Sequence, residues 1–204
     1  MLRSLDKVRT ALAAYNPSVG EDGEQLRASV AVVLRNLGDD TELLFIRRAL
    51  CEGDPWSGHI AFPGGRLDPG DAGPREAAER ETLEEVGLEL RDDELITRLD
   101  DLTGEGNMMR VSAYLYGLER DAALTINHEV ESAFWVSLVH LTDEERQVTH
   151  TSHWRETPVD FPAVRILEDE GPVLWGMTYR FVERFLAELG YSIPSMTWPR
   201  ETSG

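Results

Sequence analysis

Residues 65–88 read GRLDPGDAGPREAAERETLEEVGL, and this stretch decides how the whole chain is interpreted. Residues 74–86 are mostly good helix formers after a proline that suits a first helical turn, and Gly87 is a natural helix end. On such a helix, Glu81, Glu84 and Glu85 share one face, because residues three and four apart are neighbours. Like charges at this spacing repel each other, so a hard divalent cation such as Mg²⁺ is expected to relieve the repulsion.

A glycine-rich bend precedes this helix, with the sequence FPGG at residues 62–65. Paired glycines allow the backbone to approach another group closely, so the carbonyl of Gly65 is a candidate metal ligand. Arg80 precedes Glu81 by one position. Its planar guanidinium is suited to fixing the orientation of a neighbouring carboxylate, or to reaching the turn before the helix.

Outward from this stretch, hydrophobic patterns and turn residues predict a mixture of hairpins and helices. We expect helices at residues 2–15 and 176–189, and a loop at residues 146–163. We expect strands at residues 27–37, 42–48, 58–62, 89–102, 110–118, 131–136 and 165–167, the first two forming a hairpin. This mixture predicts an α/β fold with a mixed sheet covered by helices. The predicted organisation is a helical extension at 1–24, one domain at 25–190 and a tail at 191–204.

The composition narrows the class of protein. The 204 residues include 20 basic and 38 acidic side chains, a formal net charge of −18, so we expect no nucleic-acid partner. An anionic small molecule meets the same repulsion unless a bound cation reverses it. The single cysteine, Cys51, allows neither an internal disulfide nor a cysteine-based metal site. With no signal peptide or membrane span apparent, we expect a cytoplasmic protein without membrane contact.

The pattern G-x5-D-x8-R-E-x2-E-E-x-G-L over residues 65–88 resembles the Nudix box. It departs from the usual pattern in two ways: Asp71 stands where glutamate is usual, and eight residues rather than seven separate that position from Arg80. The resemblance implies an α/β/α sandwich with a mixed central sheet, in which the box forms a loop–helix–loop motif. It also implies that Glu81, Glu84 and Glu85 hold Mg²⁺ or Mn²⁺, and that Arg80 orients a carboxylate. The chemistry is then hydrolysis of a diphosphate linkage by water, with metal ions neutralising phosphate oxygens.

The longer box, the segment at 58–65 and later landmarks at 129–138 and 174–178 resemble the coenzyme A pyrophosphatase branch of the family. That resemblance implies a coenzyme A or acyl-coenzyme A substrate, split into 3′,5′-ADP and (acyl-)4′-phosphopantetheine. Residues 51–58 are acidic, however, where that branch has basic residues suited to a 3′-phosphate. ADP-ribose or a nucleoside-diphosphate sugar therefore remains open as the substrate.

Four further residues are candidates for the site. Glu129 is a catalytic candidate, as an extra ligand or general base from a neighbouring loop, or else an ordinary surface carboxylate. Arg47, Arg66 and Trp56 are candidate substrate-binding residues. Two broader alternatives stay open: a Nudix module that binds a nucleotide without cutting it, and a homodimer.

Overall fold

The computed structural model of the chain describes residues 4–20, 26–37, 40–104, 109–154, 157–168 and 171–195. Its α-helices are α1 (Leu5–Leu12), α2 (Pro74–Val86), α3 (Leu138–Leu141) and α4 (Gly176–Glu188), with short 3₁₀ turns η1 (Asp92–Glu94) and η3 (Glu144–Arg146). Its strands are β1 (Leu26–Leu37), β2 (Asp40–Arg48), β3 (Ile60–Ala61), β4 (Gly64–Arg66), β5 (Leu95–Arg98), β6 (Leu102–Thr103), β7 (Met109–Leu118), β8 (Val130–Ser137), β9 (Gln147–Trp154) and β10 (Thr157–Val164).

The main sheet has eight strands and is mixed. Strands β3-β2-β1-β7-β5 lie in that order, while β4 pairs with β1, β6 with β7, and β8 with β2. Only β1 and β7 run parallel among these pairs. The expected hairpin of the first two strands is confirmed, since Leu34 pairs with Leu43 in an antiparallel register. The mixed sheet predicted from the sequence is therefore also confirmed.

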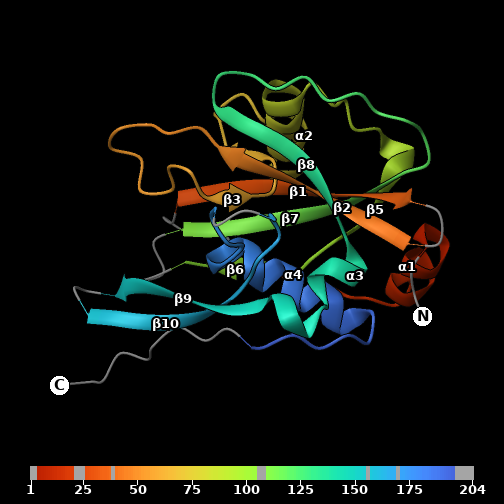
Figure 1. Cartoon of the computed structure of the whole chain (residues 1–204). Coiled ribbons are helices and arrows are strands. Elements are labelled where there is room, and N and C mark those ends of the chain that lie inside the picture. The colour runs from red at the N-terminus through yellow and green to blue at the C-terminus, as the bar shows by residue number, and fades with distance from the viewer. Residues whose placement is uncertain are drawn as a thin grey trace.

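Helices cover both faces of this sheet, which makes the three-layer α/β/α arrangement visible in Figure 1. Alternate residues of β1 point to opposite layers, as the two-residue period of a strand requires. Ala31 and Val33 pack in the apolar cluster that includes Ala78 of α2. Val32 and Leu34 pack in the larger cluster on the other face, together with buried side chains of α1, α3 and α4. Burial on both faces explains why β1 is an almost continuous apolar run.

The N-terminal helix contributes to the larger cluster. Leu5, Val8 and Leu12 are buried there. The hydroxyl of Tyr15 donates a hydrogen bond of 2.8 Å to Asp100, which lies between β5 and β6. The proposed boundary after residue 24 falls outside the described residues, as does most of the tail at 191–204.

Three sequence-based expectations about local structure were wrong. Residues 146–163, expected to be a loop, lie largely within the β9–β10 hairpin, a separate two-stranded sheet. Residues 165–167 are not a strand, and only an isolated bridge joins Val164 to Leu174. The expected strand at 89–102 is instead divided into η1, β5 and β6. In each case the apolar pattern was too short or too weak to define the pairing, which tertiary contacts decide. In the described ranges no helix is long and apolar enough to cross a membrane.

Candidate active site

Helix α2 carries the glutamate cluster, and its ends lie where the sequence predicts. It begins at Pro74 and ends at Val86, and Gly87 closes it in the left-handed conformation with φ of 67°. The N–H of Gly87 donates to the carbonyl of Leu83 at 3.0 Å, as expected for a glycine that ends a helix. Buried Ala77, Ala78, Thr82 and Val86 hold the helix against the sheet. The remaining faces are free to carry charge.

The glycine bend of β4 lies directly against this helix. The N–H of Gly64 donates a hydrogen bond of 2.9 Å to Oε2 of Glu85. A Cβ atom placed on Gly65 would lie 2.3 Å from Oε1 of Glu81, so a larger residue there would displace that carboxylate. Gly64 has a φ of +153°, and a Cβ atom on it would lie 2.3 Å from the carbonyl of Ser29 in β1. The two glycines therefore allow the backbone to approach both carboxylates.

Arg80 is the centre of the charged contacts on α2. Its Nε and Nη2 atoms donate to the two oxygens of Asp71 at 3.0 and 3.1 Å. Its Nη1 atom lies 2.9 Å from Glu81 and 3.3 Å from Glu84, and Nη2 also donates to the carbonyl of Arg66 at 3.2 Å. This single guanidinium therefore links the loop before the helix to two carboxylates of the cluster. Asp71, which the sequence showed only as a departure from the usual box, is the bidentate partner that fixes Arg80.

The carboxylates of the cluster are crowded, and their pKa values reflect this. The pKa of Glu85 is raised to about 7, chiefly by burial and also by the charges of Glu81 and Glu129, against the opposing effects of the Gly64 N–H and Arg48. Burial also raises the pKa of Glu81, with added repulsion from Glu84 and Glu129. In contrast, hydrogen bonds from Arg80 lower the pKa of Asp71. The site thus has an excess of negative charge that its own cations do not fully offset.

A divalent cation fits these residues. Within the described ranges, no three acidic, histidine or cysteine side chains already surround one point, because Arg80 lies between Glu81 and Glu84 and the Gly64 N–H holds Glu85. However, Glu81 and Glu84 both reach the same cationic nitrogen of Arg80, so they can share a positive charge. Carboxylate oxygens beside a backbone carbonyl are the ligands that Mg²⁺ and Mn²⁺ prefer.

The other candidate residues lie at different distances from this cluster. Glu129 is exposed in the turn before β8, but its charge acts on both Glu81 and Glu85. Arg66 is exposed at the end of β4, where its carbonyl contacts Arg80. Trp56 is 45 % exposed on the loop between β2 and β3. Arg47 pairs with Glu131 at 2.9 Å, and none of its described contacts reaches the carboxylates of α2.

Sequence reasoning did not single out Arg48, although it is the arginine of β2 that reaches the cluster. Its Nη2 atom lies 2.9 Å from Oδ2 of Asp54, and its Nη1 atom lies 4.0 Å from Oε1 of Glu85. The alternation of side chains along β2 could have shown on which face Arg48 lies, because Leu44 and Ile46 pack on the α2 side of the sheet and Arg48 continues that face. The pairing of β2 with β8 is irregular between Arg47 and Arg48, which made the alternation hard to use there.

An aromatic group lies at the edge of the same region. The ring of Trp175, just before α4, is 4.2 Å from the ring of His150 and 5.4 Å from that of His59, measured between centroids. Burial lowers the pKa of both histidines. Both shifts favour the neutral imidazole, and the two rings connect the β9–β10 hairpin to the segment before the box.

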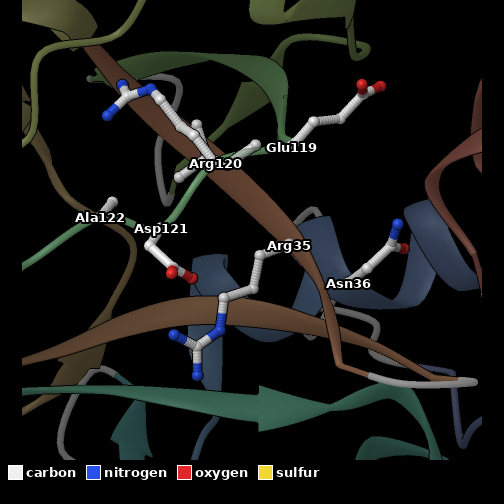
Figure 2. Close-up of a pocket in the computed structure, with 7 residues that line it drawn as sticks. Arg35, Asn36, Glu119, Arg120, Asp121 and Ala122 are labelled. Atoms are coloured by element: carbon white, nitrogen blue, oxygen red, sulfur yellow. The ribbon is translucent and has the colours of Figure 1, made fainter.

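A separate hollow of about 210 Å³ lies at the other end of β1. Arg35 and Arg120 contribute to its wall, and Figure 2 shows their guanidinium groups pointing in different directions. Arg35 pairs with Glu42 at 2.7 Å and stacks over Trp135, while Arg120 pairs with Glu94 at 2.6 Å. Both cations already have partners, and the hollow is remote from the glycine bend, which pairs with residues 28–30 of β1. We therefore assign no chemistry to it.

Comparisons with known proteins agree with this geometry. The family model described as the NUDIX domain matches residues 25–157. A mitochondrial coenzyme A diphosphatase of Mus musculus is 29 % identical over 153 residues, covering 72 % of this chain and 71 % of the relative. A peroxisomal coenzyme A diphosphatase of Caenorhabditis elegans is 29 % identical over 181 residues, covering 85 % of this chain and 72 % of the relative.

The chain spans about half the length of two curated relatives from Schizosaccharomyces pombe, 49 % and 54 %. Among solved structures, a MutT/nudix family protein from Enterococcus faecalis is similar in fold, with a TM-score of 0.56. The two chains are 18 % identical, and the match covers 92 % of this chain and 75 % of the Enterococcus faecalis chain.

Proposed function

Because the chain belongs to the Nudix family, we propose that it is a hydrolase that cuts diphosphate linkages in nucleoside diphosphate derivatives with the help of a divalent cation. One observation carries this proposal. Glu81 and Glu84 meet at Arg80 on one turn of α2, while Glu85 is held by the N–H of Gly64 in the facing bend. A solvated acidic helix face needs neither the close approach of the glycines nor a buried glutamate.

The residues take the following roles in this proposal. Glu81, Glu84 and Glu85, with the carbonyl of Gly65, would hold Mg²⁺ or Mn²⁺. An ion bound there would supply positive charge for the diphosphate oxygens and would lower the pKa of water, so that a nucleophile is available at neutral pH. Arg80, fixed by Asp71, keeps Glu81 and Glu84 in position, as a supporting hydrogen-bond partner does for a metal ligand.

Glu84 and Glu129 are the two proposed proton acceptors for the attacking water. Glu84 is the most exposed of the three glutamates, with 54 % of its side chain accessible, so it can reach both a ligand and solvent. Glu129 comes from a different element, and its charge raises the pKa values of Glu81 and Glu85. A base must come within hydrogen-bond reach of the proton it removes, so the test of the two residues is which substitution abolishes turnover.

A coenzyme A-type compound is the first proposed substrate, with 3′,5′-ADP and 4′-phosphopantetheine, or its acyl form, as products. Support comes from two relatives named as coenzyme A diphosphatases. Arg66, whose carbonyl accepts a hydrogen bond from Arg80, is proposed to contact the substrate, together with the exposed Trp56 and with Arg47 of β2. ADP-ribose and nucleoside-diphosphate sugars are the competing substrates.

The test is a product-resolved screen. Coenzyme A, acyl-coenzyme A, ADP-ribose, NADH and nucleotide sugars are incubated with the wild-type protein in Mg²⁺ and in Mn²⁺, and the products are identified by mass. Glu84→Gln and Glu85→Gln should abolish turnover while the circular dichroism spectrum stays unchanged. Glu89→Gln, an exposed glutamate after the same helix, is the matched control and should retain activity. Tight binding of a nucleotide without turnover in either metal would instead identify a non-catalytic binding module.

We further propose a partner, a cellular location and an oligomeric state for the protein. The partner is a small nucleotide and not a nucleic acid, since a net charge of −18 repels a polyphosphate chain. The protein works in the cytoplasm, which fractionation of cells that express it would test, and it can form a homodimer. Light scattering over a range of concentrations measures the oligomeric state directly.

A further inference from the structure

Two arginines differ from the others around the candidate site in having no carboxylate partner. Across the described ranges, neither Arg66 of β4 nor Arg180 of α4 forms an ion pair, and each is recorded only in contact with backbone. Arg80, Arg48 and Arg47 each contact at least one carboxylate. In a chain with a net charge of −18, a cation left without an acidic partner is a candidate for binding an anionic ligand.

Arg180 is partly buried on α4 with only a weak partner. Its Nη1 atom donates a hydrogen bond of 3.3 Å to the carbonyl of Thr103. A neutral carbonyl does not offset the cost of burying a cation. Burial and the charge of Arg184 lower the pKa of Arg180, against the opposing effect of Glu183. Arg184, one turn further along α4, pairs with Asp100 at 2.7 Å, so an anion beside Arg180 would supply what its neighbour already has.

Arg66 points to the same side of the sheet as Arg180. A Cβ atom on Gly65 would face Glu81 of α2, and the next side chain of a strand points to the opposite face. Ala28, which pairs with Arg66, packs against the apolar cluster on the α4 side. Helix α4 covers this face and α2 covers the other (Figure 1). Among the described strands β4 pairs with β1 alone, so a ligand held at the glutamates can extend around this edge to the α4 side.

The sheet register gives the spacing between the two arginines. One row of paired residues crosses the sheet from Arg66 through Ala28 and Val111 to Leu102. Its two ends are three strand spacings apart, which is about 14 Å. Arg180 contacts the carbonyl of the residue that follows Leu102. This distance suits two anionic groups of one ligand better than a single phosphate, with one group beside the glutamates and the other at Arg180.

We propose that Arg180 binds a second anionic group of the substrate, the 3′-phosphate of a coenzyme A-type compound, while Arg66 contacts the diphosphate beside the metal-binding glutamates. The inference rests on the proposed hydrolase function and deepens it by giving the phosphomonoester a site. The loop at 49–59 contains neither lysine nor arginine and cannot supply a cation for this group. The planar fork of an arginine donates two parallel hydrogen bonds to phosphate oxygens. Substrates with the additional phosphomonoester are therefore preferred.

A purely structural role for Arg180 can be separated from this one. Glutamine keeps an N–H donor for the carbonyl of Thr103 and remains a good helix former, but it loses the charge and the fork. Arg180→Gln therefore removes the proposed phosphate contact with little change to α4. Arg184→Gln is the matched control, because it removes one positive charge from the same helix at a residue that already has a carboxylate partner. A structural role would lower kcat/KM for all substrates alike.

The experiment compares coenzyme A with dephospho-coenzyme A, which differ by the 3′-phosphate, through the ratio of their kcat/KM values in Mg²⁺. We expect the wild-type protein to favour coenzyme A by about tenfold or more, as a charge-assisted contact with phosphate predicts. Arg180→Gln should reduce that ratio at least about fivefold by raising KM for coenzyme A, and Arg184→Gln should leave it within about twofold. A wild-type ratio of one or below, or a folded Arg180→Gln protein with an unchanged ratio, would overturn the inference.

A second measurement needs neither a variant nor turnover. Calorimetry with the wild-type protein in Mg²⁺ compares 3′,5′-ADP with 5′-AMP, and the first should bind about tenfold more tightly, with a difference that declines as ionic strength rises from about 0.05 to 0.5 M. Equal affinities would overturn the inference even if Arg180→Gln does not fold. Failure of the proposed function has a different signature, since no diphosphate would then be hydrolysed in Mg²⁺ or Mn²⁺. Hydrolysis without a preference for coenzyme A would leave the hydrolase proposal intact and remove only the role of Arg180.

Discussion

The backbone N–H of Gly64 donates a 2.9 Å hydrogen bond to Glu85, a glutamate that is only 2 % exposed. The bond joins a strand of the central sheet to the helix that covers it, beside the carboxylates of Glu81 and Glu84. One neutral donor does not compensate a buried carboxylate fully, so Glu85 is held in an environment that favours its protonated form. Its pKa rises to about 7 as a result.

The metal-free protein should therefore lose stability as pH rises. The pKa of Glu85 is about 7 in the folded state against an ordinary value of 4.5, so folding takes up a proton between these values. The contribution of this group is fully present below about pH 4.5 and is lost as pH rises through about 7, an effect on the order of 3 kcal/mol in all. Urea unfolding in a chelator at pH 5.5 and pH 8 measures the part that falls between these pH values, roughly 2 kcal/mol.

Glu85→Gln is the control for this pH dependence. Glutamine has similar volume and no charge, so the variant should be nearly as stable at pH 8 as at pH 5.5 apart from other titrating groups. If the wild-type protein and the variant showed the same change in unfolding free energy between the two pH values, Glu85 would not be the group responsible.

Substituting Gly65 should impair the site more than the fold. In Gly65→Ala the new Cβ would lie 2.3 Å from Oε1 of Glu81, so the carboxylate must move away from the bend. We expect weaker Mg²⁺ binding, by roughly 10- to 100-fold, as measured by calorimetry. Gly70→Ala, in the loop that follows β4, is the matched control, because nothing lies within 4 Å of a Cβ atom there. Equal affinities for both variants would show that the close approach of Gly65 is not needed for metal binding.

The N-terminal helix should be necessary for stability. Leu5 is 1 % exposed and packs in the large apolar cluster, so Leu5→Ala should lower the free energy of unfolding by about 2 to 4 kcal/mol. Ala13→Ser, on the exposed side of the same segment, should change it by less than about 0.5 kcal/mol. Denaturation in urea compares the two. A small effect of Leu5→Ala would indicate that residues 4–20 attach only loosely to the domain.

The parts of the fold that the sequence predicts are those with local signals. Pro74 and Gly87 define both ends of α2 through their own backbone preferences, and the prediction of residues 74–86 matches the helix. The β9–β10 hairpin gave no such signal. Apart from an isolated bridge from Val164 to Leu174, its strands pair with each other; β9 is rich in threonine, serine and histidine, and β10 is interrupted by two prolines. Phe161 and Val164 are buried only because other elements pack on them.

The same distinction applies to the site. The closeness of Glu81 to Gly65 follows from a motif within one stretch of sequence, so it could be predicted. The contact of Arg48 with Glu85 joins residues 37 positions apart in sequence and depends on a pairing irregularity at Arg47/Arg48. The ion pair with Asp54 further depends on how an irregular loop folds back. Alternation along β2 gives the side of the sheet on which Arg48 lies, but neither contact is encoded in one stretch of sequence, which is why Arg47 was singled out and Arg48 was not.

Arg80 should not be replaceable by lysine. The guanidinium contacts both oxygens of Asp71, and also Glu81 and Glu84, through three nitrogen atoms. A lysine ammonium provides one point charge and cannot form this fork, so Arg80→Lys leaves the orientation of the carboxylates unfixed although the net charge is unchanged. We expect kcat to fall on the order of 10- to 100-fold with little change in the melting temperature.

Arg75→Lys is the control for Arg80→Lys, since Arg75 lies on the same helix and pairs with Glu79 at 2.8 Å, away from the cluster. It should alter kcat by no more than about threefold. Activity measured in parallel for both variants separates the fork of Arg80 from a general need for arginine on α2. Full activity of Arg80→Lys would mean that charge alone keeps Glu81 and Glu84 in position, because lysine preserves the charge and removes only the geometry.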